Sequence, residues 1–259
     1  MNLTFYKYQG TGNDFIIIDN RQLFFDKNNT KLIRELCDRR FGIGSDGLIL
    51  LENDEISDFK MVYYNADGNE STMCGNGGRC IVAFAQLLGV VKNEAQFIAI
   101  DGLHHAYVNE DQIKLQMQDV TNIEVFDSHV FLDTGSPHHV QMENNLKELD
   151  VKKDGHNIRY GEPYNKEGAN VNFVSKTLDN EFSVRTYERG VEDETLSCGT
   201  GVTAVALAMH KIKQTNSNTV KLNTEGGQLI VDFKTNGDNY SDIWLIGPAK
   251  LVFKGNLTW

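Results

Sequence analysis

The sequence predicts an α+β fold made of two duplicated halves. Two short stretches nearly repeat each other, Glu70-Ser-Thr-Met-Cys-Gly-Asn-Gly77 and Glu194-Thr-Leu-Ser-Cys-Gly-Thr-Gly201, so that Cys74 and Cys198 lie 124 residues apart. Strand-like runs are numerous along the chain, whereas helix-like runs are few. At 259 residues, the chain is long enough for two domains of roughly 120 to 130 residues each.

Further pairs of short motifs keep nearly the same offset. Thr-Gly-Asn at 11–13 matches Thr-Gly-Ser at 134–136, and Gly-Ser-Asp at 44–46 matches Gly-Ala-Asn at 168–170. A polar stretch near 118–122 separates the copies, and the last strand has no counterpart inside the second copy. We therefore predict one domain of residues 1–118 plus 249–259, which carries Cys74, and a second of residues 119–248, which carries Cys198.

Hydrophobic periodicity and turn residues locate the individual elements. Short alternating or apolar runs bounded by turn residues predict strands at 15–19, 48–51, 59–64, 97–100, 105–108 and 112–117. Helical spacing predicts helices at 29–39, 78–88 and 201–212, with a weaker pattern at 146–151. Consecutive strands lack the intervening helices that a parallel sheet needs, which favours α+β over an alternating βαβ chain.

Composition narrows the classes of partner and location. The net charge is −11 and the pI is about 5.1, so most of the surface would repel nucleic acid. The longest apolar run, 81–91, is too short to span a membrane, and the N-terminus has no export signal. We expect a cytoplasmic protein whose partner is a small molecule, with no nucleic acid and no membrane.

The four cysteines are expected to be free thiols. A chain of this length without an export signal does not need disulfides. Cys74 and Cys80 are six residues apart while Cys37 stands alone, which gives no metal-ligand pair and predicts no metal site. Cys37 and Cys80 are expected to be ordinary core or partly buried residues.

Cys74 and Cys198 are predicted to lie at helix N-termini. Each begins a Cys-Gly-x-Gly motif, which is followed by a small, apolar helical run. Backbone N–H groups and the helix dipole at such a place favour an anion, either the thiolate or a substrate carboxylate. A cysteine there can have its pKa lowered from about 8.5 toward neutrality.

The chemistry of such a pair of thiols is inversion at a carbon next to a carboxylate. One group removes a proton from one face, and the other delivers a proton to the opposite face. No lysine is indicated for a pyridoxal phosphate Schiff base, and no Gly-x-Gly-x-x-Gly loop leads from a strand into a helix. We expect no cofactor, and we expect the helix N-termini to stabilise the developing charge.

A combination of motifs along nearly the whole chain resembles diaminopimelate epimerase. The motifs are Gly10-Thr-Gly-Asn-Asp-Phe15, Asn65-Ala-Asp-Gly68, Cys74-Gly-Asn-Gly-Gly-Arg-Cys80, Glu188-Arg-Gly190 and Cys198-Gly-Thr-Gly201. The resemblance implies two pseudo-symmetric domains, each with mainly antiparallel strands curled around a central helix. It also implies a cofactor-independent isomerase that interconverts LL- and meso-2,6-diaminopimelate for lysine and peptidoglycan precursor biosynthesis, with domain closure over the substrate.

The resemblance assigns roles to individual positions. Cys74 and Cys198 would be the catalytic base and acid of a two-base mechanism. The side chains expected to bind substrate are Asn13, Asn65, Asn170, Glu188 and Arg189, with the last two at the end that does not react. The backbone N–H groups expected to hold the reacting carboxylate are those of Gly75, Asn76, Gly199 and Thr200.

Two further assignments follow from the resemblance. His138 and Glu188 match residues that would tune the thiol pKa values. Phe253 lies where the family usually has a tyrosine at a dimer contact, which implies a homodimer.

Three positions depart from the family pattern. Gly47 stands where some members have a substrate-binding glutamine, and Ser136 stands where many have asparagine. The segment from Arg189 to Cys198 is one residue longer than in many members. These departures affect the surroundings of the site more than the two thiols.

Two alternatives remain open at the level of sequence. One is a racemase or isomerase of the same architecture that acts on a different amino acid. The other is a binding protein in which Cys74 and Cys198 form a redox-switched disulfide. Exchange of the α-proton under reducing conditions separates an enzyme from the redox switch, and substrate screening separates the two enzymes.

Overall fold

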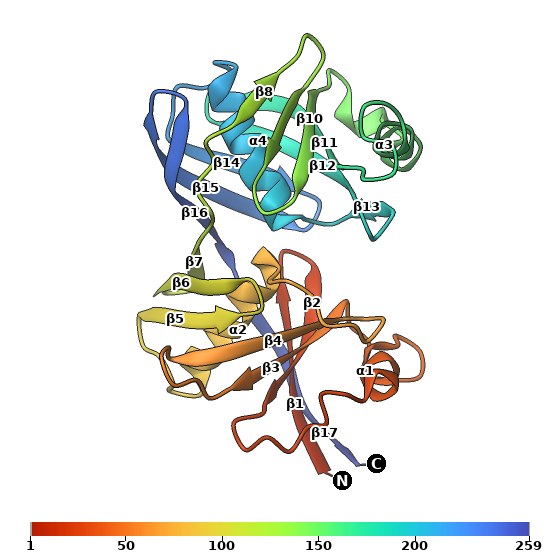
Figure 1. Cartoon of the computed structure of the whole chain (residues 1–259), viewed down its shortest axis with the longest axis vertical. Coiled ribbons are helices and arrows are strands. Elements are labelled where there is room, and N and C mark those ends of the chain that lie inside the picture. The colour runs from red at the N-terminus through yellow and green to blue at the C-terminus, as the bar shows by residue number, and fades with distance from the viewer. Residues whose placement is uncertain (1, 259) are drawn as a thin grey trace. The chain divides into compact units, whose positions relative to one another are not determined.

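A computed structural model describes residues 2–258 in two compact units (Figure 1). The first unit runs to Leu115 and includes the chain from Gly247 onward, and the second comprises Gln116–Ile246. The predicted boundaries were 118/119 and 248/249. Met1 and Trp259, which end the first predicted domain, lie outside the described residues.

The first unit is a run of paired strands. In order of pairing they are β17 (Lys250–Thr258), β1 (Asn2–Gly10), β2 (Asn13–Asp19), β3 (Gly47–Glu52), β4 (Phe59–Asn65), β5 (Glu94–Ala99), β6 (Gly102–Asn109) and β7 (Gln112–Gln116). Two of these pairs, β2 with β3 and β4 with β5, are parallel. The other pairs are antiparallel.

The second unit repeats this arrangement. In order of pairing its strands are β8 (Ile123–Val125), β9 (Val130–Asp133), β10 (Pro137–Met142), β11 (Asn170–Leu178), β12 (Glu181–Glu188), β14 (Thr219–Thr224), β15 (Gly227–Asn236) and β16 (Asn239–Pro248). The short β13 (Asp193–Thr195) is an addition that pairs with β12. The parallel pairs are again the third and the fifth, β10 with β11 and β12 with β14.

The identical order of parallel and antiparallel pairs confirms the predicted duplicated α+β fold. One strand is supplied differently in the two units. The C-terminal β17 pairs with β1 at the place that β8 occupies beside β9. The final strand therefore has a positional counterpart in the second unit, which the sequence had not indicated.

The helices also correspond between the units. Helix α1 (Thr30–Cys37) lies between β2 and β3, as α3 (Val151–Tyr160) lies between β10 and β11. Helix α2 (Gly75–Leu87) follows β4, and α4 (Gly199–Lys211) follows β12 and β13. The weak pattern at 146–151 is a 3-10 turn (Leu146–Glu148) followed by the longer α3, whose extent was not predicted.

Helices α2 and α4 are the central helices of their units. Most of their residues are buried, and α4 contacts strands from β9 to β15 (Figure 1). Both begin two or three residues earlier than the predicted 78 and 201, at Gly75 and Gly199. Hydrophobic spacing cannot mark a start that consists of glycines and a polar residue.

An ionic cluster fixes the beginning of β2 against the loop that precedes β3. Lys7 is 7% exposed, and its ammonium lies 2.7 Å from Asp14 Oδ2 and also donates to the Gly44 carbonyl. Arg39 bridges Asp14 and Asp46, at 2.7 and 2.6 Å. Burial alone would raise the pKa of Asp14, but hydrogen bonds from Arg39 and Lys7 outweigh it and lower that pKa to about 2.

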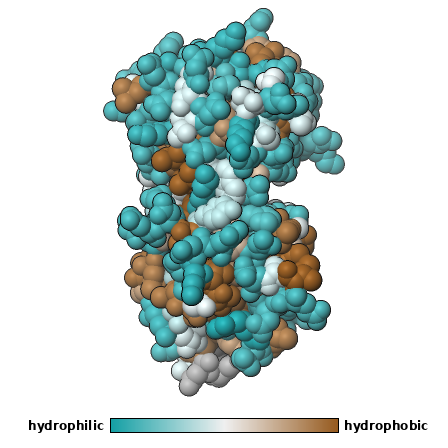
Figure 2. All heavy atoms as spheres, turned by 90° about the vertical axis from the view of Figure 1, so that its left-hand side faces the viewer, coloured by the Kyte–Doolittle hydropathy of each residue, from teal (hydrophilic) through white to brown (hydrophobic). Residues whose placement is uncertain are grey.

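The face shown in Figure 2 is mainly hydrophilic, with apolar side chains interspersed. Phe41, Ile56 and Leu23 are the most exposed of the large apolar residues, at 93, 80 and 67%. Among residues 2–258, no helix has the length and apolar character needed to cross a membrane.

We predict that Gly155→Ala destabilises the second unit. Replacing glycine by alanine inside a helix normally stabilises it by roughly 1 kcal/mol. At Gly155 the new Cβ would lie 2.4 Å from Tyr187 Cβ, so α3 must move away from β12. We expect a loss of about 1 to 3 kcal/mol in the free energy of unfolding, measured by denaturant titration. Asn157→Ala, on the exposed face of the same helix, is the control, and equal effects of the two changes would contradict the prediction.

We predict that Asp14→Asn lowers stability at neutral pH and weakens its dependence on acid. Because the folded pKa of Asp14 is depressed, its stabilisation is present above about pH 4 and is lost as the pH falls toward 2. The variant should lose about 2 kcal/mol at pH 7, and the gap to the parent should narrow between pH 4 and 2. Thermal unfolding across this range measures it. Asp179→Asn, on a fully exposed side chain, should leave the curve unchanged.

Candidate active site

Cys74 and Cys198 are the N-cap residues of the two central helices. Both have extended backbone angles, φ −96° and ψ 133° at Cys74 and φ −122° and ψ 118° at Cys198. Neither cysteine side chain caps its own helix. Each sulfur therefore lies where the helix dipole favours a negative charge.

Glycines allow each helix to start close to the strands. A Cβ on Gly77 would lie 3.2 Å from Ile49 Cδ1, and one on Gly78 would lie 2.8 Å from Met73 Sδ. In the second unit, a Cβ on Gly201 would lie 2.6 Å from Asn172 Oδ1. The second glycine of each motif, Gly77 or Gly201, thus lets the helix start pack closely against the side chains behind it.

The first half-site centres on Asn13, at the start of β2. Its Oδ1 accepts from the Cys74 thiol at 3.6 Å and from Asn76 Nδ2 at 3.3 Å. Its Nδ2 donates to Asp46 Oδ2 at 2.6 Å. Asp46 is in turn held by Arg39, so the ionic cluster fixes the orientation of Asn13.

Arg79 stabilises this half-site through hydrogen bonds and was not among the predicted site residues. It is completely buried, and it donates to the Gly75 carbonyl at 3.2 Å, to Thr11 Oγ1 at 3.2 Å and to Asn76 Oδ1 at 2.9 Å. Burial lowers the pKa of Arg79 to about 10, which leaves it a cation at neutral pH. Its position inside the Cys74–Cys80 motif could have drawn attention to it, but hydrophobic spacing indicated only core.

The second half-site centres on Ser136 and Thr200. Asn170 Nδ2 donates to Ser136 Oγ at 3.1 Å, and Ser136 Oγ lies 3.3 Å from Thr200 Oγ1. Thr200 Oγ1 lies 3.4 Å from Cys198 Sγ. Ser136 thus reaches the sulfur through the Thr200 hydroxyl, which makes up for its short side chain.

His138 joins the same half-site from β10. Its Nε2 lies 3.1 Å from Ser136 Oγ, and its Nδ1 lies 3.1 Å from Asn172 Nδ2. Burial, followed by the charge of Arg189, lowers the pKa of His138 to about 3, so the ring is neutral. Asn172 was missed from the sequence, although its two-residue spacing from Asn170 places both on one face of a strand.

The remaining predicted substrate ligands lie at strand ends. Asn65 is exposed at the end of β4, and Glu188 ends β12, where its Oε2 accepts from Thr195 Oγ1 at 3.0 Å. Arg189 is exposed and its guanidinium donates to the Glu167 carbonyl at 3.1 Å. The Arg189 backbone N–H donates to Asn170 Oδ1 at 2.9 Å.

Two further predicted positions have clear surroundings. At Gly47, a Cβ would lie 2.6 Å from both Tyr63 Cε2 and the Tyr64 carbonyl, so a glutamine does not fit the present packing. Phe253 on β17 is 47% exposed and packs edge to face against Phe5, with ring centroids 5.9 Å apart. It is flanked by Leu251 and Val252, which are also exposed.

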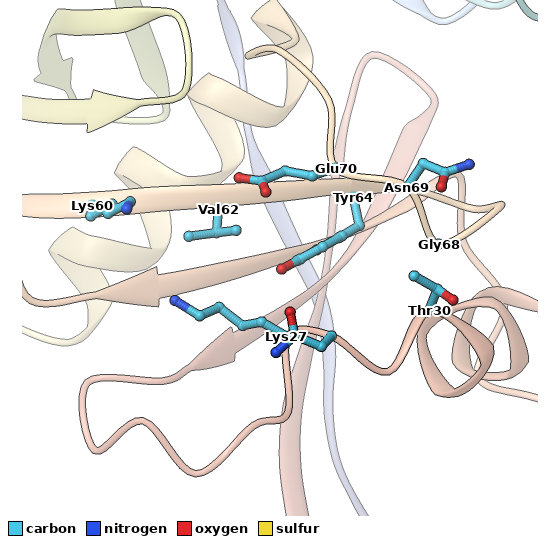
Figure 3. A pocket seen from close by; sticks show the side chains of 9 residues that line it. Lys27, Thr30, Lys60, Val62, Tyr64, Gly68, Asn69 and Glu70 are labelled. Atoms are coloured by element: carbon cyan, nitrogen blue, oxygen red, sulfur yellow. The ribbon is translucent and has the colours of Figure 1, made fainter.

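A separate hollow of about 350 Å³ lies in the first unit (Figure 3). The residues that line it are Lys27, Asn28, Thr30, Lys60, Val62, Tyr64, Gly68, Asn69 and Glu70. Lys27 pairs with Glu52 at 2.9 Å. None of the predicted site residues lines this hollow, so we assign it no role in the site.

All four cysteines are free thiols, as expected. Cys37 and Cys80 are 3% and 0% exposed, so Cys37 is fully and not partly buried. Within the described chain, no group of three or more His, Cys, Asp and Glu side chains is arranged to hold a metal ion.

The chain is similar to known proteins over nearly its whole length. The family model described as diaminopimelate epimerase matches residues 5–123 and 130–252. Diaminopimelate epimerase of Flavobacterium psychrophilum is 62% identical over 250 residues, covering 96% of this chain and 98% of the relative. That of Chlorobaculum tepidum is 44% identical over 259 residues, covering 96% of this chain and 99% of the relative.

Solved structures share the fold at much lower identity. A phenazine biosynthesis protein of the PhzF family from Bacillus anthracis aligns with a TM-score of 0.78 at 14% identity, over 100% of both chains. A hydroxyproline epimerase from Agrobacterium vitis aligns with a TM-score of 0.67 at 14% identity, over 99% of this chain and 92% of that one. With the fold, the two N-cap cysteines and close relatives in agreement, the chain belongs to the diaminopimelate epimerase family.

Proposed function

We propose that this protein interconverts LL-2,6-diaminopimelate and meso-2,6-diaminopimelate with its own side chains and without a cofactor. The observation that carries the proposal is the pair of N-cap cysteines on topologically equivalent helices. The names of the close relatives supply the substrate. This reaction would serve lysine and peptidoglycan precursor biosynthesis.

In the proposed mechanism the two thiols act on opposite faces of one α-carbon. One thiolate takes the α-proton as the Cα–H bond breaks, and the thiol of the other cysteine gives its proton to the opposite face. The carbanion between these steps is stabilised as an enolate of the neighbouring carboxylate. The N–H groups at the starts of α2 and α4, from Gly75, Asn76, Gly199 and Thr200, would bind that carboxylate.

The asymmetric residues would select the substrate. Asn65, Glu188 and Arg189 differ between the two halves and carry polar groups at strand ends. A substrate with a second amino acid end offers an ammonium and a carboxylate that match Glu188 and Arg189. We also propose that Phe253, with the exposed Leu251 and Val252, lies in a homodimer contact.

The test is deuterium incorporation at the α-carbon of LL-diaminopimelate in heavy water, with reductant and no added cofactor. We expect exchange to accompany inversion. Cys74→Ala and Cys198→Ala should each lower the rate of epimerisation by at least about 100-fold, because each removes one acid–base partner. Cys37→Ala changes a buried thiol at the end of α1 and should retain the activity.

Three outcomes would contradict parts of this proposal. Near-normal epimerisation by Cys198→Ala would exclude the two-base mechanism. Binding without α-proton exchange under reducing conditions would favour the redox-switch alternative. Faster exchange with another amino acid would keep the mechanism and replace the substrate.

We predict that Arg189→Ala mainly weakens substrate binding. Loss of a charged hydrogen bond at the unreactive end should raise KM about 10- to 100-fold, with a smaller change in kcat. Steady-state kinetics with diaminopimelate measure both constants. Arg34→Ala, on the exposed face of α1, is the control, and a fall in kcat at unchanged KM would place Arg189 at the reacting end instead.

A further inference from the structure

The strand registers define which residues of the two half-sites are equivalent. Phe15 pairs with Gly47 as His138 pairs with Asn170, and Leu48 pairs with Tyr64 as Val171 pairs with Tyr187. Each pair is shifted by 123 residues. On this register Asn13 corresponds to Ser136, Phe15 to His138, and Ile49 to Asn172.

The two halves have therefore diverged behind the cysteines. In the first unit, apolar Phe15 and Ile49 pack beneath the helix start, near Gly77. In the second unit, the polar pair His138 and Asn172 occupies these places, and both are completely buried. Buried polar groups must find partners, so the hydrogen bonds of this pair are strongly determined.

The orientation of Asn172 follows from partners that can act in only one way. Its Nδ2 donates to the carbonyl of His139 at 3.0 Å, and a carbonyl can only accept. The same Nδ2 lies 3.1 Å from His138 Nδ1. His138 Nδ1 must then be the acceptor, so the neutral ring carries its proton on Nε2.

This tautomer fixes the direction of the next hydrogen bonds. His138 Nε2–H donates to Ser136 Oγ, which also accepts from Asn170 Nδ2. The orientation of Asn170 is itself fixed, because its Oδ1 accepts from the Arg189 N–H. With both lone pairs of Ser136 engaged, the Ser136 proton points to Thr200 Oγ1. The Thr200 hydroxyl is then free to direct its own proton to Cys198 Sγ.

In the first half-site the hydrogen bonds present an acceptor to the cysteine, whereas in the second they present a donor. Asp46 accepts from Asn13 Nδ2, which turns Asn13 Oδ1 toward Cys74. Arg79 donates to Asn76 Oδ1, so that Asn76 Nδ2 also faces Asn13 Oδ1. Cys74 Sγ thus meets an oxygen that can only accept, and a proton on the sulfur completes that contact.

We propose that the substrate-free protein holds Cys198 as the thiolate and Cys74 as the thiol, with Asn172 as the positioning residue that sets this difference. A hydroxyl donor stabilises an anionic sulfur, whereas a carbonyl oxygen of an amide stabilises a protonated one. Because both cysteines are N-caps of equivalent helices, the helix dipoles do not distinguish them. The difference comes from the side chains behind them.

Charged groups near the two cysteines differ as well. In the first unit, Arg79 favours an anion at Cys74. Asp14 and Asp46 oppose it, but Lys7 and Arg39 pair with these two carboxylates and offset part of their charge. Arg79 directs its hydrogen bonds to neutral oxygens, so it acts on the sulfur only through space. In the second unit, the Arg189 charge acts on His138 and helps to keep the ring neutral. Glu188 accepts from Thr195, and its charge disfavours an anion nearby.

The consequence for catalysis rests on the proposed function. In the resting protein, Cys198 would take the α-proton and Cys74 would deliver one, so one configuration of the substrate meets the correct protonation state. After that turnover Cys198 carries the proton and Cys74 is the thiolate. Proton exchange with solvent or turnover in the reverse direction restores the resting state.

The test uses alkylation, which needs no turnover. The substrate-free protein is treated with iodoacetamide under reducing conditions that do not consume the reagent, at a series of pH values. Peptide mass spectrometry then gives the rate at Cys74 and at Cys198 separately. We expect Cys198 to reach half-maximal reactivity at a pH at least about one unit below that of Cys74, since only the thiolate reacts.

Substitutions along the hydrogen-bond chain that leads from Asn172 to Cys198 test the role of these hydrogen bonds. Thr200→Val removes the donor and should raise the half-maximal pH of Cys198 by about one to two units, with Cys74 unchanged. Thr200→Ser keeps the hydroxyl and is the matched control. The ionised carboxylate of Asn172→Asp can only accept, so it should move the His138 proton to Nδ1, reverse the direction of the hydrogen bonds from His138 to Thr200 and shift Cys198 in the same direction as Thr200→Val.

Nitrogen NMR of the histidine ring provides a readout that does not depend on stability. In the parent protein His138 should be neutral and protonated on Nε2, and in Asn172→Asp it should be protonated on Nδ1. If Asn172→Asp does not fold, Thr200→Val alone decides the matter. A half-maximal pH for Cys74 at or below that of Cys198, or an unchanged Cys198 profile in Thr200→Val, would overturn the proposal. Deuterium exchange with the parent protein would still report on the proposed function in either case.

Discussion

Each unit buries the start of a helix immediately after a cysteine, and the packing of the strands and polar side chains around it follows from that burial. A helix N-terminus inside a protein needs partners for its backbone N–H groups. In each unit the cysteine does not supply a side-chain cap, and the following residues are small enough for the helix to approach the strands closely. Because these backbone N–H groups need acceptors, they can bind an anionic ligand.

The strands are arranged around this constraint. Each unit pairs its strands in the same order of parallel and antiparallel neighbours. The central helix follows the fourth strand along the chain in the first unit and the short sixth strand, β13, in the second. The loops before β2 and β10 bring Asn13 and Ser136 to the two sulfurs, directly or through Thr200. Duplication therefore reproduces a framework in which a polar residue at a strand start meets a cysteine at a helix start.

Divergence within that framework has placed different polar groups behind the two cysteines. The first unit uses an ionic cluster at its surface and the buried Arg79 to orient two asparagines. The second unit uses the buried His138 and Asn172 to orient two hydroxyls. Both solutions satisfy their buried groups, because a polar atom left unpaired would cost about 1 to 3 kcal/mol.

The duplicated α+β fold, the placement of Cys74 and Cys198 at helix starts and the importance of nearby residues such as Asn13 and His138 could all be predicted from the sequence. Glycine, turn residues and hydrophobic spacing act locally, so short motifs express them. The burial of Arg79, the orientation of Asn13 by Asp46 and the contact of Asn172 with His138 could not be predicted from the sequence. These contacts join residues 33 or more positions apart or depend on which atom of an amide faces which partner, so they need the packed fold.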